Sequence, residues 1–269
     1  MAVHVKSTDQ LRDQWDRQSD HYTRTSALLT TKVYRTLLPF LRLEEAQVVV
    51  EAACGPGFGL ELLLRSMPAS GKVLANDISP KFLEMVRGKG LERVELVEAN
   101  SEALPYESGV ADRYVAALSL NLVEFPERMA AEAFRVLKSG GIAAFTVWGD
   151  RDKATIYDLL LSLQEKYSSQ HFRSSFHLSD PATLTHLLRS VGFTQIVTFD
   201  EFGHSPNLDP VQLQGMFMHH PEYVQVYEGL EEGKKAAFVE DLKAYIHTVL
   251  EVKQQPMAIQ ARIAIAFKP

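Results

Sequence analysis

Closely spaced glycines at residues 55 to 59 are the first feature of this sequence that could do chemistry. They follow a β-branched run, 48–50, and Glu51, in the stretch VVVEAACGPGFG at 48–59. Glycine has no Cβ, so such a loop can turn tightly and bring its backbone close to a ligand. Residue 60 is Leu, which departs from the Gly-x-Gly-x-x-Gly pattern of nicotinamide and flavin sites. No Gly-Lys-Ser or Gly-Lys-Thr follows, so a phosphate-binding P-loop is excluded.

A sheet must position this loop, and the apolar patterns predict one. Short strands are expected at 48–50, 72–76, 94–97, 113–120, 142–148 and 196–202. Helices are expected between them, at 60–67, after Ser79 and Pro80, and from 180 to 192. A further helix is expected to begin at Pro126, to include Leu137, and to end at Gly140 and Gly141. Alternation of strand and helix is typical of a mostly parallel sheet with helices on both faces. A period-two run from 259 to 267 predicts the last strand.

Two helical stretches fall outside this alternation. The first, 7–42, carries spaced aromatic residues such as Trp15 and Tyr22, and the second, 205–256, is rich in Met, His and Tyr. We therefore expect an N-terminal helical lid at 1–42, a core at 43–204, a helical cap inserted at 205–256, and the final strand of the core at 257–269.

Four stretches in order, spanning 48–149, resemble one known family. They are VVVEAACGPGFG at 48–59, LANDISPKFLEMV at 74–86, EANSEALPYESGVADRY at 98–114 and AFRVLKSGGIAAFTVWG at 133–149. The sequence resembles the class I S-adenosylmethionine-dependent methyltransferases, in the branch of the ubiquinone and menaquinone biosynthesis C-methyltransferases. The resemblance implies a Rossmann-like, seven-stranded, mostly parallel α/β fold. It also implies S-adenosyl-L-methionine as the methyl donor and S-adenosyl-L-homocysteine as the product.

The resemblance also implies where the methionine part and the ribose of the cofactor would lie. Glu51, Gly55 and Gly57 match the family's first motif, whose backbone contacts the methionine part, and Ala53 stands at the family's first glycine. Asp77 ends the second strand, where a carboxylate can accept hydrogen bonds from both ribose hydroxyls.

The adenine would lie against Ile78. Asn100 stands where the family usually has Asp, and its side-chain oxygen would accept a hydrogen bond from the adenine amino group. Ser101 and Glu102 would read the ring through neighbouring backbone groups. The full set of expected cofactor residues is Tyr22, Glu51, Ala53, Gly55, Gly57, Asp77, Ile78, Asn100, Ser101, Glu102 and Leu118.

Catalytic residues are harder to find, because methyl transfer mainly requires that donor, methyl group and nucleophile be held in line. A base is needed only where the acceptor must lose a proton. The candidates are Tyr22, Trp148 and His177, with His204, His219 and His220 as further side chains that could border a pocket. Each single His is more readily explained as a structural or surface residue. Adjacent residues cannot share one helix face, so we predict no metal site at His219 and His220.

The predicted cap favours a small, partly apolar acceptor. An apolar pocket could be lined by Met216, Phe217, Met218, Tyr223 and Tyr227. The same residues could instead form the inward face of the cap or a dimer interface. Other functions that stay open are a methyltransferase for protein or RNA, a cofactor-binding accessory subunit without turnover and, more distantly, a nicotinamide oxidoreductase.

Composition limits the partners. A net charge of -6 and a pI near 5.9 leave no excess of Lys and Arg to neutralise a phosphate backbone, so nucleic acid is not expected. No run of about 18 apolar residues predicts a membrane span. Cys54 is the one cysteine, which excludes an internal disulfide, and the first residues lack the apolar core of a signal peptide. We therefore expect a cytoplasmic protein, and a nuclear location by passive distribution stays open. A small-molecule acceptor is the expected partner, and a homodimer is left open.

Overall fold

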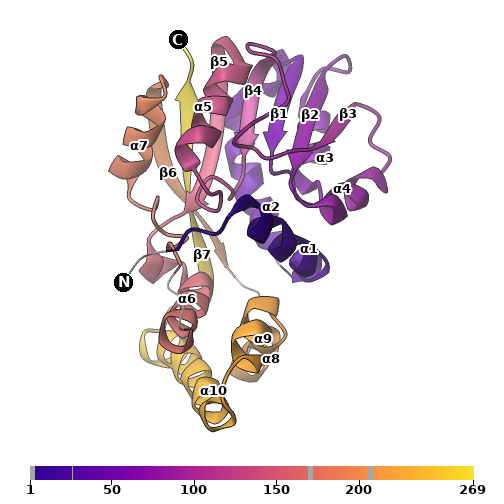
Figure 1. Ribbon diagram of the computed structural model, residues 1–269. Helices are drawn as coiled ribbons and strands as arrows, with labels where there is room; N and C mark the ends of the chain where they lie inside the picture. Colours follow the sequence, from indigo (N-terminus) through magenta and orange to yellow (C-terminus); the bar gives the residue numbers. More distant parts are fainter. Residues whose placement is uncertain (1–3, 26, 169–171, 205–208) are drawn as a thin grey trace.

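The computed structural model describes residues 4–25, 27–168, 172–204 and 209–269, and in them a twisted sheet lies between helices (Figure 1). The strands are β1 (Val48–Ala52), β2 (Lys72–Asp77), β3 (Val94–Glu98), β4 (Ala111–Ala116), β5 (Leu137–Trp148), β6 (Thr194–His204) and β7 (Ala258–Phe267). Their order in the sheet is β3-β2-β1-β4-β5-β7-β6. The first five are parallel, and β7 runs antiparallel to both β5 and β6. The predicted seven-stranded, mostly parallel α/β sheet is confirmed.

Three of the described helices begin at side-chain caps, which are Ser79, Asp180 and Asp209. The helices are α1 (Thr8–Thr25), α2 (Ala27–Leu37), α3 (Phe58–Ser66), α4 (Pro80–Arg87), α5 (Pro126–Val136), α6 (Thr155–Tyr167), α7 (Pro181–Ser190), α8 (Pro210–Met218), α9 (Pro221–Glu228) and α10 (Glu232–His247). Ser79 caps α4 by accepting from the Phe82 amide, and Pro80 follows it in the first turn. Asp209 forms a capping box with Gln212 at the start of α8.

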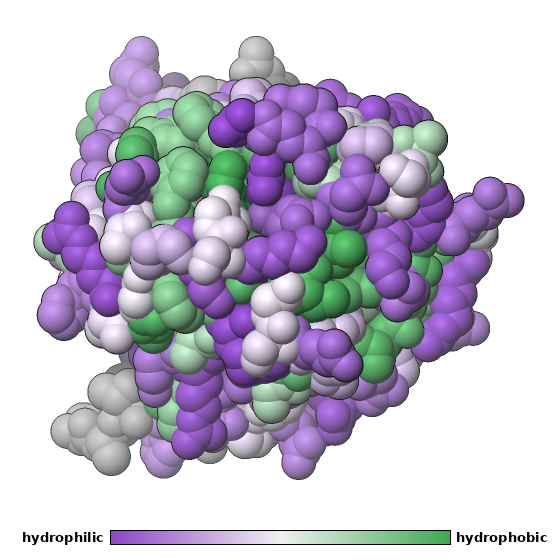
Figure 2. Space-filling model, turned by 90° about the horizontal axis from the view of Figure 1, so that it is seen from above, coloured by the Kyte–Doolittle hydropathy of each residue, from purple (hydrophilic) through white to green (hydrophobic). Residues whose placement is uncertain are grey.

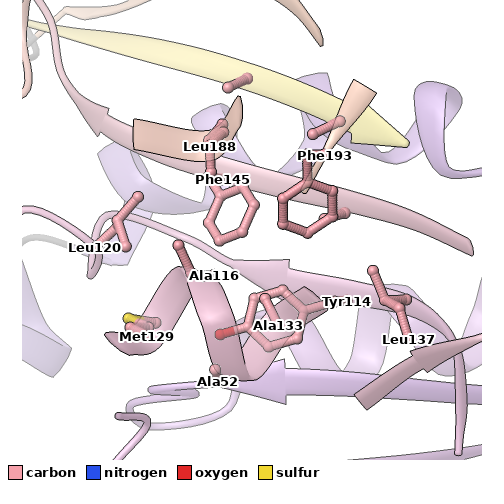
Figure 3. Packing of buried hydrophobic residues seen from close by; sticks show 14 of the residues in the cluster. Ala52, Tyr114, Ala116, Leu120, Met129, Ala133, Leu137, Phe145, Leu188 and Phe193 are labelled. Atoms are coloured by element: carbon pink, nitrogen blue, oxygen red, sulfur yellow. The ribbon is translucent and has the colours of Figure 1, made fainter. Parts of the chain in front are cut away.

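Apolar side chains cover both faces of the sheet. On one face, residues of β4 and β5 pack against α5 and α7, with Tyr114, Phe145 and Phe193 at the centre (Figure 3). On the other face, a second cluster joins the sheet to α2, α3 and α4, and it includes Leu37, Leu60 and Leu83. Burial of both faces explains why the sequences of β1 and β5 form continuous apolar runs, such as 48–50 and 142–145, rather than alternating patterns.

Two predicted boundaries are wrong. Leu137 is the first residue of β5 rather than part of α5, and the Gly140 amide donates to the Lys268 carbonyl at 2.9 Å. The two glycines therefore lie in a strand, beside the end of the chain, and do not stop a helix. The predicted strand 113–120 ends at Ala116, because Leu118 has a φ of 52° that no strand accommodates. Residues 117–122 consequently form a loop at the carboxyl edge of the sheet.

The cap has its own apolar core and draws on two parts of the chain. α8, α9 and α10 pack with α6 around buried residues such as Leu159, Leu213 and Phe238. A hydrogen bond of 2.5 Å from the Tyr245 hydroxyl to Asp158 ties α10 to α6. The sequence prediction of helices within 205–256 agrees with the described part, whereas α6 was not predicted, and residues 205–208 lie outside the described residues.

Helix α1 lies beyond the carboxyl ends of the parallel strands, between the sheet and the cap (Figure 1). Arg12 Nε donates to the Ile78 carbonyl at 3.2 Å, and Ser79 Oγ donates to Asp16 at 2.5 Å. The opposite end of the molecule shows hydrophilic side chains with separate groups of apolar ones between them (Figure 2). Helix α1 thus contacts the loop that follows β2 at the carboxyl edge of the sheet.

Candidate functional site

The loop after β1 adopts a backbone that favours glycine. Ala53, Gly55 and Gly57 have φ values of 53°, 54° and 77°, in the left-handed region. A Cβ on Gly55 would meet nothing within 4 Å, so there is free space beside the loop. The loop backbone can therefore approach a ligand there, as the sequence predicts.

Asp77 ties this loop to the end of β2. Its side chain is 5% exposed, and its two oxygens accept hydrogen bonds from the amides of Gly55, at 2.8 Å, and Ser79, at 2.9 Å. Burial raises the pKa of Asp77 to about 6, although these amides favour the ionised form. Each carboxylate oxygen has a second lone pair, so the group keeps the capacity to accept hydrogen bonds from a diol.

Glu51 is a buried carboxyl group at the end of β1. Its Oε2 has no hydrogen-bond partner among the described residues. Burial raises the pKa of Glu51 to about 8, and repulsion from Asp77 acts in the same direction. The Tyr34 ring and the Glu51 carboxyl group both lie where a Cβ on Gly59 would be, so the glycine is required for this packing. A cationic or hydrogen-donating group of a ligand would satisfy the unpartnered oxygen.

The turn after β3 is held by its own polar groups. Asn100 Oδ1 accepts from the Glu102 amide at 3.0 Å, and Asn100 Nδ2 donates to Thr8 Oγ1 of α1 at 3.1 Å. Ser101 Oγ accepts from Asn76 Nδ2 at 2.9 Å. The structure brings these residues to the same edge as Asp77, and their role toward an adenine ring stays a prediction.

A cavity of about 740 Å³ lies between α1, α6, α9 and the loops that follow β4 and β5. Tyr22 and Leu118 line it, whereas the glycine loop and Asp77 do not. Burial raises the pKa of Tyr22, and the charge of Asp77 acts in the same direction, so Tyr22 lies within electrostatic reach of Asp77. The expected cofactor residues therefore fall into two neighbouring sets, one beneath α1 and one in this cavity.

Aromatic rings form two walls of the cavity region. Trp15 and Tyr22 meet edge to face with ring centroids 5.7 Å apart, and both pack on Phe82. Trp148 stacks on Tyr157 with centroids 4.0 Å apart. Such walls suit a flat, apolar ligand, because offset and edge contacts between rings are favourable.

The structure separates the predicted catalytic candidates. Tyr22, Trp148 and His220 line the cavity. His177 is not among its lining residues; its Nδ1 lies 2.9 Å from the Ser174 carbonyl, and burial lowers its pKa. His219 is exposed at the end of α8, with Nδ1 2.7 Å from the Gly215 carbonyl. His204 is the last residue of β6, and its side chain lies outside the described part of the structure.

The cap residues expected to line a pocket lie elsewhere. Phe217 and Tyr223 are buried in the cap's core, and Met216, Met218 and Tyr227 pack against it. The cap side of the cavity is instead formed by His220, Gln225, Val226, Gly229 and Leu230, with Tyr157, Leu160, Leu161, Gln164, Glu165 and Tyr167 from α6.

Sequence reasoning also missed contacts made by α1. His21 of α1 meets His220 with ring centroids 5.0 Å apart, so the lid touches the cap across the cavity. Burial lowers the pKa of His21 to about 4, with His220 acting in the same direction. The helix α6 had a signal in the apolar spacing of Ile156, Leu159 and Leu163, whereas the pairing of the two histidines had none.

Residues 50–145 match a family model described as a methyltransferase domain. This part of the chain is therefore similar to methyltransferase domains. A chloroplastic 2-methyl-6-phytyl-1,4-hydroquinone methyltransferase 1 of Oryza sativa subsp. japonica is 33% identical over 135 residues, 48% of this chain and 40% of the relative. The ubiquinone/menaquinone biosynthesis C-methyltransferase UbiE of Salmonella arizonae is 35% identical over 100 residues, 35% of this chain and 40% of the relative. The chain thus matches less than half the length of these curated relatives.

Solved structures share the fold over a greater length. The cyclase SpnF has a TM-score of 0.59 at 17% identity, with 100% of this chain and 99% of that chain covered. Phosphoethanolamine N-methyltransferase 2 of Haemonchus contortus, in complex with phosphomonomethylethanolamine and S-adenosylhomocysteine, has a TM-score of 0.61 at 14% identity, with 98% and 61% covered. These likenesses confirm the predicted class I methyltransferase fold.

In the described residues, no helix is long and apolar enough to cross a bilayer.

Proposed function

We propose that this protein transfers a methyl group from S-adenosyl-L-methionine to a small, partly apolar acceptor. The observation that carries this proposal is the glycine loop, joined to Asp77 at the carboxyl edge of a methyltransferase domain, the edge at which Leu118 and Trp148 line a cavity of about 740 Å³. Ligands of open α/β sheets bind at this edge.

The residues present fit the cofactor. The open space beside Gly55 would receive the methionine part, and the unpartnered Glu51 Oε2 would accept a hydrogen bond from its ammonium group. Asp77 would hold the ribose hydroxyls. When bound, the cofactor supplies a methyl group on a positively charged sulfur. The proton that Glu51 holds near neutral pH would leave when a cation binds beside it, since an opposite charge favours the ionised carboxylate.

The acceptor would occupy the cavity. Its aromatic walls around Trp15 and Trp148 would orient a flat molecule, and α1 and the cap would exclude water. The matched relatives are named for hydroquinone and quinone substrates, and a ring of that size would fit the volume. A folded protein or an RNA helix would not enter a cavity closed on these sides, which favours the small acceptor over a macromolecule.

One observation favours a second candidate. SpnF, which is named as a cyclase, matches this chain over its whole length. A protein that binds the cofactor without transferring its methyl group would keep the same fold, so an accessory or non-methylating role is the alternative. We also propose the lid, core and cap boundaries of 1–42, 43–204, 205–256 and 257–269, with α6 of the core segment packed into the cap, and a cytoplasmic location from the single cysteine. Light scattering would decide the open question of a homodimer.

Calorimetry with S-adenosylmethionine and S-adenosylhomocysteine tests the proposal. We expect micromolar dissociation constants, about 7 to 8 kcal/mol. S-adenosylhomocysteine formation with hydroquinones, folded proteins and RNA then separates the acceptor classes. Absence of heat with either ligand, in protein shown by mass spectrometry to carry no ligand from purification, would overturn the proposal. Binding without turnover on any acceptor would favour the accessory role.

A further inference from the structure

Gln18 of the lid helix α1 has an amide group that no described residue uses. The residue is 9% exposed, and it lines the cavity. No hydrogen bond joins either amide atom to the part of the chain that the structure describes. The amide is also not among the unpartnered polar atoms that are sealed from solvent, so it is accessible from the cavity.

The faces of α1 show which way Gln18 points. Asp20 and Arg24 are exposed and mark the side of the helix that meets solvent. Gln18 lies on the other side, on the same face as Tyr22, because residues four apart in a helix are neighbours. Tyr22 lines the cavity too, and its ring packs on Phe82 of α4. The Gln18 side chain therefore points into the molecule, toward the cavity.

A largely buried amide without a protein partner indicates a polar group on the ligand. Most buried polar side-chain atoms in proteins have a hydrogen-bond partner, and burying one without a partner is unfavourable. The carboxamide of Gln18 offers two donors on Nε2 and an acceptor, Oε1. A neutral group that can both donate and accept, such as a hydroxyl, can bond to either end of it.

The charged side chains around the cavity do not favour an ion. They carry both signs, and several already have partners: Lys6 Nζ donates to Gln14 at 2.6 Å, and Glu165 accepts from the Arg151 guanidinium. His21 is kept neutral near pH 7, since burial lowers its pKa to about 4. The charged residues of the lining are Lys6, Asp13, Arg17, Glu165 and Arg173, and the carboxylates of Glu102, Glu124 and Glu127 act on Arg173.

We propose that Gln18 determines acceptor specificity through a hydrogen bond to a neutral polar group of the acceptor. Trp15 and Tyr22 lie one helical turn to either side of Gln18 and line the same cavity, so their rings would contact the apolar body beside that group. The lid would thus recognise the polar group of the acceptor, whereas Phe217 and Tyr223 of the cap are buried in the cap's own core. This inference rests on the proposed function, because it names a residue and a ligand chemistry for the same cavity.

The substitution Gln18→Met tests the inference, because Met is similar in length and lacks the amide. The probes are 2-naphthol and 2-methylnaphthalene, which differ only in a hydroxyl against a methyl group. Fluorescence titrations are made on the full chain with S-adenosylhomocysteine present. We expect Gln18→Met to bind 2-naphthol about fivefold more weakly than the parent does, and 2-methylnaphthalene within about twofold. Gln255→Met, at an exposed residue outside the cavity lining, should change neither affinity.

Thermal unfolding without ligand separates a binding role of Gln18 from a structural one. Gln18→Met removes no hydrogen bond within the described chain, so its melting temperature should equal or exceed that of the parent. A lower melting temperature, or failure to fold, would show that the amide supports the fold and would overturn the inference.

The remaining outcomes separate this inference from the proposed function. Unchanged binding of 2-naphthol in Gln18→Met, equal weakening of both probes, or no binding of either probe to the parent would each overturn the role of Gln18. Calorimetry should give the same S-adenosylhomocysteine affinity for parent and variant. If the variant binds S-adenosylhomocysteine about fivefold more weakly, Gln18 serves the cofactor and only this inference fails. If the parent does not bind S-adenosylhomocysteine, the proposed function itself fails.

Discussion

The substitution Gly59→Ala tests the packing beneath the glycine loop, because two effects of known sign oppose each other. Gly59 lies in the first turn of α3 with an ordinary helical backbone, so alanine should stabilise the helix by at most about 1 kcal/mol. The added Cβ would overlap the ring of Tyr34 and the carboxyl group of Glu51, both of which are buried. Overpacking of this kind costs about 1 to 3 kcal/mol. Since neither neighbour has free space, we expect a net loss of about 2 kcal/mol.

Gly215→Ala is the matched control. Gly215 lies inside α8, and a Cβ there would meet nothing within 4 Å, so the same substitution should stabilise by about 0.5 to 1 kcal/mol. Urea unfolding followed by tryptophan fluorescence measures both changes. Gly59→Ala should also weaken S-adenosylhomocysteine binding by displacing Glu51, which Gly215→Ala leaves in place. A Gly59→Ala protein as stable as the parent would refute the packing described for Tyr34 and Glu51.

Three further predictions follow from the buried polar groups. Asp77→Ala should weaken cofactor binding by about 1.5 to 3 kcal/mol, because the acceptor for the ribose hydroxyls is lost. It should also lower the melting temperature, because the amides of Gly55 and Ser79 lose their acceptor. Unchanged affinity in calorimetry would place the ribose elsewhere. The folded-state pKa of Glu51, about 8, lies above its usual value, so its stabilising contribution is complete at acid pH and is lost as pH rises toward 8. Melting temperatures of Glu51→Gln should therefore fall less than those of the parent between pH 5 and 9, and parallel curves would contradict this. The pKa of His21 is lowered to about 4, so its neutral form stabilises the protein above about pH 6.5, and this contribution is lost as pH falls toward 4. The melting temperature of His21→Asn should therefore fall less than that of the parent between pH 6.5 and 4. An equal fall in both proteins would rule this out.

The core of the fold could be predicted because its signals are local in the sequence. The run 48–50, the glycines after it, and Asp77 at the next strand end lie within one strand-loop-helix-strand unit, and the structure joins Asp77 directly to the Gly55 amide. Ser79 and Pro80 marked the start of α4 correctly for the same reason, since a cap acts within one helical turn.

The cap and the acceptor side could not be predicted in this way. Met216 and Tyr227 look alike whether they face a ligand or the core of the cap, and only the packing of α6 against α8 and α10 decides between these positions. The hydrogen bond from Asn121 to the Ser175 carbonyl has no local signal either, because the two residues are 54 positions apart in the chain. Gly140 was interpreted as a helix stop because a glycine after an apolar helical pattern usually marks one. Its strand partner, Lys268, is more than a hundred residues away, so no local pattern indicates the pairing.

The position of β7 has a consequence for how the protein folds. The final strand lies between β5 and β6, and the sheet pairs β6 with β7 alone. During synthesis, β6 therefore has no strand to pair with until residues 258–267 have left the ribosome, whereas β1 to β5 can already assemble. Contacts between strands so far apart in the chain form slowly, and an unpaired strand edge is prone to associate with other chains. Loss of residues 258–267 would leave β6 without a paired strand and β5 with an open edge, so we expect a chain without β7 to aggregate more readily than the parent.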